Sequence, residues 1–212
     1  MSKKLRSSLE TCSRCVRLCQ ERDRIKEEFP DHYAKPVGQW GDRRARILIV
    51  GLAPGLHGAA RTGKAFVGDS SGAFLFSRLF NTGLSDSPDS DKAKLLGVKI
   101  TNAVKCYPPA NRPDRREIHN CSDYLKRELD TFVSSSDRKG RSIIALGRLA
   151  HQAVYSSLGL RASGFGHGAL SNISPSLTIF SSFHPSRLNV NTKRLTPKML
   201  DSVLVLAKKH AN

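Results

Sequence analysis

Five cysteines are the residues of this 212-residue chain whose type and spacing most directly suggest chemistry. Cys12 and Cys15 form a C-x-x-C pair, and Cys106 and Cys121 are separated by fourteen residues. Paired thiolates can bind a metal centre, and four of them can hold zinc or an iron–sulfur cluster. Core thiols are an equally good interpretation of the spacing alone, because C-x14-C is not a zinc-knuckle spacing. Cys19 is then a spare thiol or a competing ligand.

A glycine-rich loop, GLAPGLHGAARTGKAFVGD over residues 51–69, follows directly on the apolar run RILIV. Its part from Gly58 to Ala65 differs by one residue from a phosphate-binding P-loop. The last position of a P-loop is Ser or Thr, whose hydroxyl coordinates magnesium, whereas Ala65 coordinates nothing. GLAPGLH also separates the strand from Gly58, and a P-loop begins directly after its strand. A P-loop-like nucleotide hydrolase is therefore a disfavoured alternative.

Two further polar segments could carry binding or catalytic side chains. FHPSRLNVNT places His184 just beyond an apolar run, and the following proline restricts the histidine backbone to extended conformations. A surface turn is the alternative interpretation of this segment. In TNAVKCYPPANRP, Asn102 lies inside an apolar strand and must satisfy its amide, which offers a donor and an acceptor together. A hydrogen bond to neighbouring backbone is the commoner use of such an asparagine.

Helices and strands that could position these residues alternate along the chain. Ser70 or Ser71 is expected to begin the second helix as its N-cap and Thr196 the last one, with Pro197 in its first turn. The first helix would be charged and would carry the first three cysteines. Apolar runs predict strands at 46–50, 98–104, 142–146 and 177–183, and helical periodicity predicts helices at 3–29, 71–82, 114–133, 148–158 and 196–210.

This alternation predicts an α/β fold. We expect a three-layer α/β/α arrangement around a central four-stranded parallel sheet, in a single domain over residues 1–212. Ligands bind beyond the carboxyl ends of the strands in such sheets. The loop after Val50, residues 105–113 and the loop after Phe183 are therefore expected on one rim.

The charge balance favours an anionic partner. Thirty-five Lys and Arg against eighteen Asp and Glu give a formal net charge of +17, which is typical of nucleic-acid-binding domains. A solvated surface without a partner, or adaptation to an unusual cytoplasm, is the alternative. The sequence has no apolar run of about eighteen residues, so it predicts no membrane span. The basic start MSKKLRSSLE leads into no apolar segment, so we expect a cytoplasmic protein without disulfides.

Taken together, several motifs resemble the uracil-DNA glycosylase superfamily, specifically family 5 of its iron–sulfur branch, which is related to family 4. They are GLAPG, HGAARTGKAFVGDSSG, ITNAVKC with the following PP, LGRLA, HPSRLN and RLTP. The resemblance covers almost the whole chain in order, from Cys12 to the final helix. It implies a four-stranded parallel sheet between helices, and we expect a monomer.

The resemblance also implies a cofactor. Cys12, Cys15, Cys106 and Cys121 would hold a [4Fe-4S] cluster, and Cys19 would lie outside it. The cluster would be structural, because it would join the N-terminal helix to the loop and helix around residues 106–121.

The glycine-rich loop is then interpreted as the floor of a base pocket. The backbone of GLAPG, with Gly51, Ala53 and Gly55, would approach a flipped nucleotide closely. Phe66 matches the aromatic residue that stacks on uracil, although an ordinary core phenylalanine is the alternative. Asn102 matches the residue that reads the base edge.

Four residues would act on the sugar and the DNA. Family 4 has a glutamate where this chain has Leu52, and family 5 offers Asp69 instead, for which N-capping of the next helix is the alternative. His184 matches the histidine of the HPS motif. Ser186 and Arg187 lie where this motif contacts DNA and fills the gap that the flipped base leaves.

The function that follows is hydrolysis of the N-glycosidic bond of uracil in DNA, which leaves an abasic site without strand cleavage. The partner would be DNA containing uracil. Because the first motif lacks its usual acid, the substrate range could include other deaminated bases such as hypoxanthine. A non-catalytic iron–sulfur DNA-binding module is the alternative outside the enzymes.

Overall fold

The structure, a computed structural model, describes residues 9–134 and 140–211. Within these residues a six-stranded sheet has the order β1-β3-β2-β4-β6-β5. The strands are β1 (Trp40–Gly41), β2 (Ile47–Gly51), β3 (Val98–Asn102), β4 (Arg141–Leu146), β5 (Leu170–Ser174) and β6 (Leu177–Ser182). The four central strands β3, β2, β4 and β6 pair in parallel, as the apolar runs predict.

The two edge strands were absent from the sequence prediction of four strands. β1 pairs antiparallel with β3, and β5 pairs antiparallel with β6. β1 has two residues and lies inside the segment expected to be a connection. β5 has the polar sequence LSNIS, and its residues alternate between exposed and partly buried. Neither edge strand therefore has the apolar run that identifies a central one.

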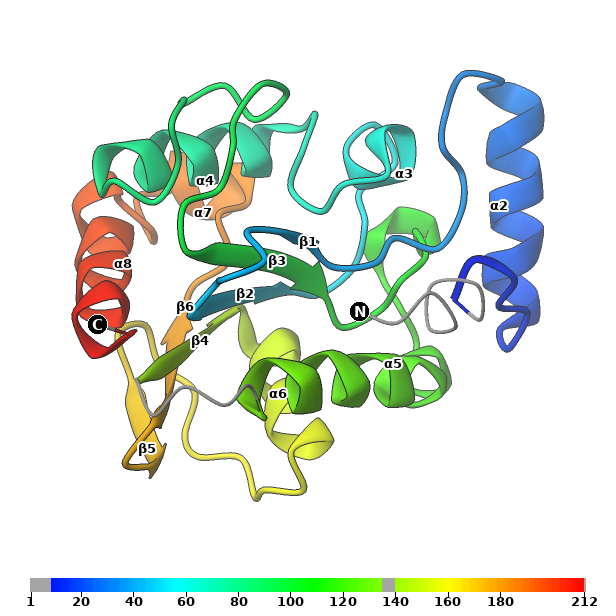
Figure 1. The fold of residues 1–212 in the computed structure, drawn as a ribbon. Helices are drawn as coiled ribbons and strands as arrows, with labels where there is room; N and C mark the ends of the chain where they lie inside the picture. Colours follow the sequence, from blue (N-terminus) through cyan, green and yellow to red (C-terminus); the bar gives the residue numbers. More distant parts are fainter. Residues whose placement is uncertain (1–8, 135–139, 212) are drawn as a thin grey trace.

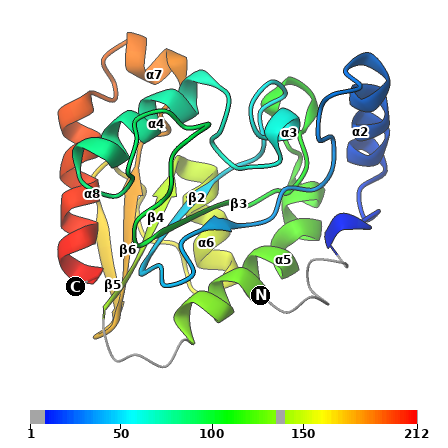
Figure 2. The same cartoon turned by 45° about the horizontal axis from the view of Figure 1, so that its top comes forward.

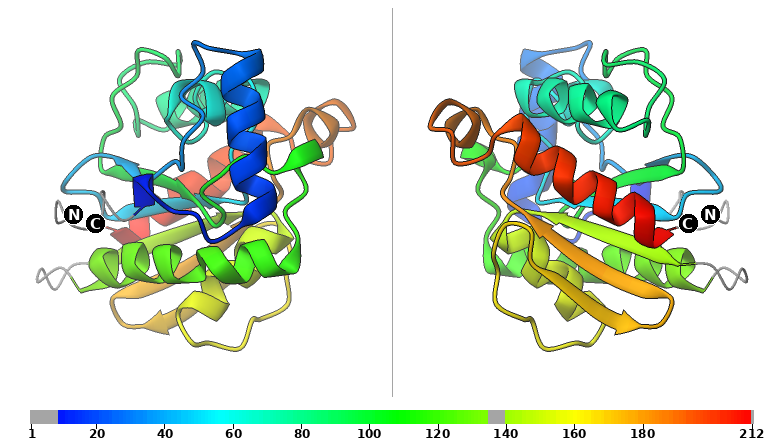
Figure 3. Two further views of the ribbon diagram at one scale, coloured as in Figure 1. Left: turned by 90° about the vertical axis from the view of Figure 1, so that its right-hand side faces the viewer. Right: turned by 90° about the vertical axis from the view of Figure 1, so that its left-hand side faces the viewer.

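Helices cover both faces of the sheet (Figures 1 and 3), and alternate side chains of the central strands pack in different hydrophobic clusters. Ile47 and Ile49 pack in the cluster of α4 and α8, whereas Leu48 and Val50 pack in the cluster of α5 and α6. This alternation follows from the two-residue period of a strand. The helices are α2 (Val16–Glu28), α3 (Ala59–Thr62), α4 (Ser70–Asn81), α5 (Arg115–Val133), α6 (Arg148–Ser157), α7 (Arg187–Asn191) and α8 (Pro197–Ala211), with a 3-10 turn η1 (Pro109–Asn111).

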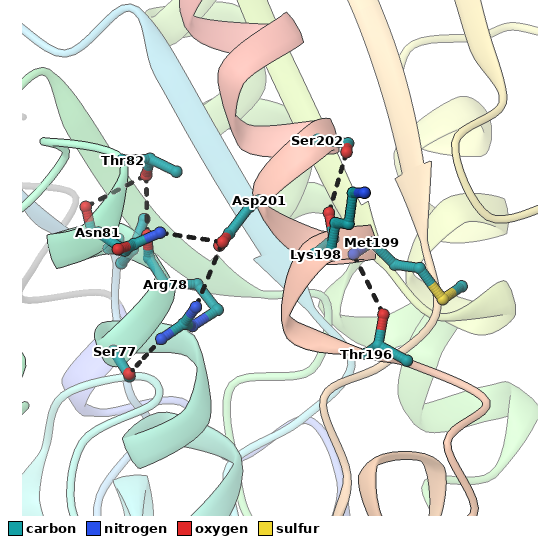
Figure 4. Close-up of polar contacts among 10 residues, drawn as sticks. Ser77, Arg78, Asn81, Thr82, Thr196, Lys198, Met199, Asp201 and Ser202 are labelled. Atoms are coloured by element: carbon teal, nitrogen blue, oxygen red, sulfur yellow. Dashed lines mark hydrogen bonds and ion pairs between the residues drawn. The ribbon is translucent and has the colours of Figure 1, made fainter.

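Polar contacts between α4 and α8 fix the two helices of one layer (Figure 4). Asp201 of α8 accepts hydrogen bonds from Arg78 at 3.2 Å and from Asn81 at 3.0 Å. The Thr196 hydroxyl accepts from the backbone N–H of Met199 at 3.3 Å, so the predicted cap of the last helix is confirmed. The predicted caps of α4 are wrong, because Asp69 occupies that position.

The N-terminal helix is shorter than predicted. α2 begins at Val16, and its N-cap Cys15 has an extended backbone, so Cys12 and Cys15 precede the helix and only Cys19 lies within it. Residues 3–8, which were also expected to be helical, lie outside the described part of the chain. The segment before α2 is bound to α5 instead, because Arg14 and Asn120 exchange hydrogen bonds between side chain and backbone, both at 3.1 Å.

The segments after β2 and β6, which lead to α3 and α7, lie on the same side of the sheet (Figure 2). This arrangement confirms the predicted rim. None of the helices formed by residues 9–134 and 140–211 has both the length and the apolar character that crossing a bilayer requires.

Candidate active site

A cavity of about 910 Å³ opens beyond the carboxyl ends of β2, β3 and β6. This volume is typical of a small-molecule or cofactor site. Of the residues predicted for the site, only Gly51 is not in contact with the cavity itself. Its lining includes Ala53, Gly55, Phe66, Asp69, Asn102, His184, Ser186 and Arg187.

Gly51 lies behind the cavity, where the side chains of Asn102 and Phe66 leave no space for another side chain. A Cβ atom on Gly51 would lie 2.4 Å from Asn102 Oδ1 and 2.6 Å from Phe66 Cε2. Phe66 itself has a φ of 60°, in the left-handed region that bulky residues rarely adopt. Strained residues of this kind cluster at functional sites. The glycine thus permits Phe66 and Asn102 to meet at the end of β2.

Asn102 lines the cavity, and its side-chain oxygen is buried. The residue is 2% exposed, and its Oδ1 makes no hydrogen bond within the described residues. The alternative interpretation, a hydrogen bond to neighbouring backbone, therefore does not apply to this oxygen. A buried polar atom without a partner is costly, and such atoms are rare in native proteins. A ligand in the cavity would remove this cost.

The two carboxylate oxygens of Asp69 have different surroundings. Its Oδ1 accepts a hydrogen bond from the Gly72 backbone N–H at 2.9 Å, so Asp69 is the N-cap of α4. Its Oδ2 faces the glycine-rich loop: it lies 3.0 Å from a Cβ built on Gly55 and 2.2 Å from one built on Gly58. Both glycines line the cavity. One carboxylate oxygen therefore remains for the cavity while the other caps the helix.

His184 lies next to Phe66, with the ring centroids 5.8 Å apart. Burial lowers the pKa of the His184 imidazole to about 4, and the negative charge of Asp69 opposes this effect. The imidazole is therefore neutral at neutral pH and carries one N–H donor. The Asn189 side chain donates to the His184 carbonyl at 2.8 Å, which fixes the backbone of the histidine.

The rest of the HPS segment is partly helical, whereas a loop was predicted. The Ser186 hydroxyl accepts from the Asn189 backbone N–H at 3.3 Å and caps α7, which Arg187 begins. Arg187 is exposed at the edge of the cavity. Leu188 is 71% exposed, and the sequence prediction did not include it. An apolar residue within a polar segment was the signal that could have identified it.

Asn111 is a second residue that sequence reasoning missed. It lines the cavity, has a φ of 56°, and its Oδ1 lies 4.0 Å from the point where a Cβ on Gly55 would lie. Asp69 Oδ2 faces the same point at 3.0 Å. Both side chains therefore lie close to Gly55. The short ANRP sequence gave no periodic signal, because this position depends on the tertiary fold.

The position of the Lys64 side chain excludes the P-loop interpretation. Its Nζ lies 5.4 Å from the centroid of the Trp40 ring, and Lys64 does not line the cavity. Ala65 is fully buried. A phosphate in this cavity would meet neither the lysine nor the hydroxyl that a P-loop requires.

The cysteines line a second, smaller cavity between α2, α5 and the segment after β3. Buried surroundings raise the pKa of the Cys106 thiol to about 12 and that of Cys121 to about 11. The Cys19 sulfur accepts a hydrogen bond from Arg22 at 3.1 Å, and the Cys15 sulfur accepts one from the Asn120 side chain at 3.4 Å. The residues of this lining that carry sulfur are Cys12, Cys15, Cys19, Cys106 and Cys121.

The cysteines do not form a compact site for one metal ion. Within residues 9–134 and 140–211, no three His, Cys, Asp or Glu side chains are grouped closely enough to hold a single ion. Tetrahedral zinc brings its four ligand atoms to about 2.0–2.3 Å from one centre. The donor set, all sulfur and from three chain segments around one cavity, fits a larger cluster better than a single ion.

Comparisons with known proteins show the family of this chain. The model of the family described as "Uracil DNA glycosylase superfamily" matches residues 39–207. The chain is 43% identical over 204 residues to a protein of Pyrobaculum aerophilum named "Type-5 uracil-DNA glycosylase", with 92% of this chain and 87% of the relative covered. A protein of Thermus thermophilus with the same name is 41% identical over 214 residues, with 96% of this chain and 95% of the relative covered.

A more distant group also matches. A "Type-4 uracil-DNA glycosylase" of Pyrobaculum aerophilum is 32% identical over 154 residues, which are 69% of this chain and 69% of the relative. The chain therefore belongs to the uracil DNA glycosylase superfamily. Within the superfamily its similarity is higher to the type-5 members than to the type-4 members, as the sequence motifs predicted.

Proposed function

We propose that this chain removes uracil from DNA by hydrolysing the bond between the base and the deoxyribose. The observation that carries the proposal is that Asn102, whose buried Oδ1 has no hydrogen-bond partner among the described residues, lines one cavity with Asp69 and His184. The relatives named uracil-DNA glycosylases support it. The basic charge of the chain suits DNA as the substrate.

Base recognition would use Asn102 and Phe66. The Asn102 amide can accept from the N3–H of uracil and donate to its O4, whereas cytosine presents the opposite pattern at these two positions. Phe66 would stack on the flipped base, as aromatic residues do in enzymes that extrude a nucleotide. Hypoxanthine also presents a carbonyl beside a ring N–H, so it is a further expected substrate.

Bond cleavage would use groups at the two ends of the breaking bond. Negative charge develops on the departing uracil, and the neutral His184 N–H would donate to it. Positive charge develops on the sugar, and Asp69 Oδ2 would stabilise it and orient a water toward C1′. Asn111, whose side chain also lies close to Gly55, would be a second partner for that water.

Release of free base tests the proposal. We expect chromatography to detect free uracil after the protein is incubated with a uracil-containing oligonucleotide. The same oligonucleotide with thymine at that position should release no base. Binding of the uracil oligonucleotide without release of uracil would favour the alternative, a non-catalytic DNA-binding module.

Arg187 is proposed to occupy the gap that the flipped nucleotide leaves. It is exposed beside Leu188 at the beginning of α7, and both could enter the duplex from this position. We expect Arg187→Ala to weaken binding to DNA with a lesion roughly tenfold, an effect of about 1.4 kcal/mol. Binding to undamaged duplex should change less. Fluorescence anisotropy with both duplexes measures the difference.

Lys126→Ala is the control for the loss of one positive charge. Lys126 is exposed on α5 and pairs with Asp130, in the helix layer away from α7. It should have little effect on either duplex. An equal loss of affinity for both duplexes in Arg187→Ala would make Arg187 a phosphate contact and not a wedge.

Cys12, Cys15, Cys106 and Cys121 are proposed to bind a [4Fe-4S] cluster, with Cys19 outside it. The cavity that the cysteines share supports a cluster site, and the exclusion of Cys19, which lines the same cavity, rests on the resemblance to family 5. The cluster would stabilise the attachment of α2 to α5 within one domain. Iron would stabilise the Cys106 and Cys121 thiolates in surroundings that otherwise raise the pKa of these two thiols.

We expect the anaerobically purified protein to be brown, with broad absorbance near ~400 nm and about four irons and four sulfides per chain. Cys12→Ser should lower the yield and the iron content, whereas the matched change Cys19→Ser should have little effect. Iron and sulfide analysis of the three proteins measures this. Stoichiometric zinc without sulfide would refute the cluster.

A further inference from the structure

Lys105 and Glu128 form an ion pair in the interior of the protein that has no part in the steps described above. The distance from Lys105 Nζ to Glu128 Oε2 is 2.6 Å, and the two side chains are 1% and 2% exposed. Neither residue lines the base pocket. Burying two charges is costly, and apolar replacements of such pairs often keep or increase stability. Stability alone therefore does not account for this pair.

The Lys105 ammonium is fully engaged with the end of β3. Besides Glu128, it donates to Thr101 Oγ1 at 2.8 Å and to the Asn102 carbonyl at 2.7 Å. An ammonium has three N–H donors, so each donor has a partner. The Thr101 hydroxyl in turn donates to Glu128 Oε2 at 2.7 Å. The last two residues of β3 are thus held by one charged network.

Asn102 depends on this network because its side-chain oxygen has no partner in the described part of the chain. The direction of its amide is therefore set by the backbone that carries it. That backbone is fixed on one side by the pairing of Asn102 with Gly51 of β2. It is fixed on the other by Lys105, which binds the Asn102 carbonyl.

The same pair adjoins the cysteine cavity. Lys105 precedes Cys106 and lines that cavity, and its backbone makes a hydrogen bond to Cys121. Cys121 and Glu128 lie on one helix, α5, about two turns apart. The ion pair therefore connects the element that carries the cysteines with the residue that faces the base pocket.

We propose that the Lys105–Glu128 ion pair is a positioning device for Asn102, which aims the Asn102 amide at the base. The proposal rests on the role of Asn102 in base reading given under the proposed function. A shift of about 1 Å in such a group can reduce a rate by roughly 10²-fold. The pair would thus act on excision through Asn102 without touching the substrate.

The test is Lys105→Met combined with Glu128→Gln, which removes both charges together and leaves neither buried alone. Glutamine retains an acceptor for the Gln39 backbone N–H that Glu128 binds. Single-turnover excision from a duplex with one uracil should slow by up to ~10²-fold. The same double change in an Asn102→Ala background should slow excision no further, because residues that act through one group are not additive.

Two further variants make the test independent of folding defects. Thr101→Val is nearly isosteric and keeps the ion pair, so it should fold. Losing the hydrogen bond that Thr101 donates to Glu128 and the one that it accepts from Lys105 should slow excision roughly fivefold, again only when Asn102 is present. Arg78→Met with Asp201→Asn is the matched control, because it removes the ion pair between α4 and α8. The control should excise uracil as the unmodified protein does.

The outcomes separate this proposal from the function on which it rests. Slow excision by Asn102→Ala, with no additional loss from the Lys105 and Thr101 changes, is the expected result. The positioning role is refuted if the losses add to that of Asn102→Ala, or if the variant with Lys105→Met and Glu128→Gln excises uracil normally. In either case the proposed role of Asn102 in base reading is unaffected. Normal excision by Asn102→Ala would instead refute the role of Asn102.

Discussion

Asp69→Asn should fold normally, bind uracil-containing DNA, and excise uracil at least ~10²-fold more slowly, the lower end of what a positioned acid or base contributes. The reason is that the two carboxylate oxygens have different surroundings. Asparagine keeps Oδ1 as the acceptor for the Gly72 N–H, so the N-cap of α4 is preserved. It replaces the charged Oδ2 that faces Gly55 and Gly58 with an amide. The negative charge that would stabilise the sugar cation is then lost.

Asp114→Asn is the matched control. Asp114 is exposed and caps α5 in the same way, with its side chain accepting from the Glu117 N–H at 2.7 Å. Both variants should melt within a few degrees of the unmodified protein, and only Asp69→Asn should lose single-turnover excision. Excision at the normal rate by Asp69→Asn would leave this residue with its N-cap role alone.

His184→Ala should reduce single-turnover excision by roughly 10²–10³-fold, the loss that follows removal of one preorganised donor to a developing anion. His184→Gln, which restores an N–H donor, should recover part of this loss. A pKa of about 4 keeps the His184 imidazole neutral throughout the neutral range. Lowering the pH through the ordinary range of histidine should therefore not reduce excision by protonating His184.

A weak effect of His184→Ala would contradict more than one residue assignment. It would remove the proposed donor to the base and with it the functional meaning of the HPS segment. The binding of uracil-DNA by this variant distinguishes the cases, since a donor used only in the transition state affects the rate and not the affinity.

The central fold could be predicted from the sequence because buried parallel strands are apolar runs. The runs RILIV and SIIAL form most of β2 and β4, and the boundaries of both strands lie within one residue of the prediction. The edge strand β5 could not be predicted, because its sequence LSNIS is half exposed and polar. The helix expected over 3–29 was wrong at Cys12 and Cys15, because contacts with α5 outweigh local helical preference there.

The site could be predicted in position but not in detail. Parallel topology places the loops after β2, β3 and β6 on one rim, and this was enough to bring Asp69, Asn102 and His184 together. The different surroundings of the two Asp69 oxygens could not be foreseen, because they depend on the path of the glycine-rich loop. The same holds for Asn111, whose contact with the cavity depends on a backbone conformation that asparagine tolerates but does not require.

Strand cleavage with and without alkali tests the central claim most directly, namely that this chain hydrolyses the glycosidic bond of uracil and leaves the DNA backbone intact. An oligonucleotide with one uracil is incubated with excess protein, and half of the reaction is then treated with hot alkali. We predict intact strands without alkali and a single break at the uracil position with alkali, and no break in the thymine control. Full-length strands in both halves, or breaks before alkali, would contradict the account.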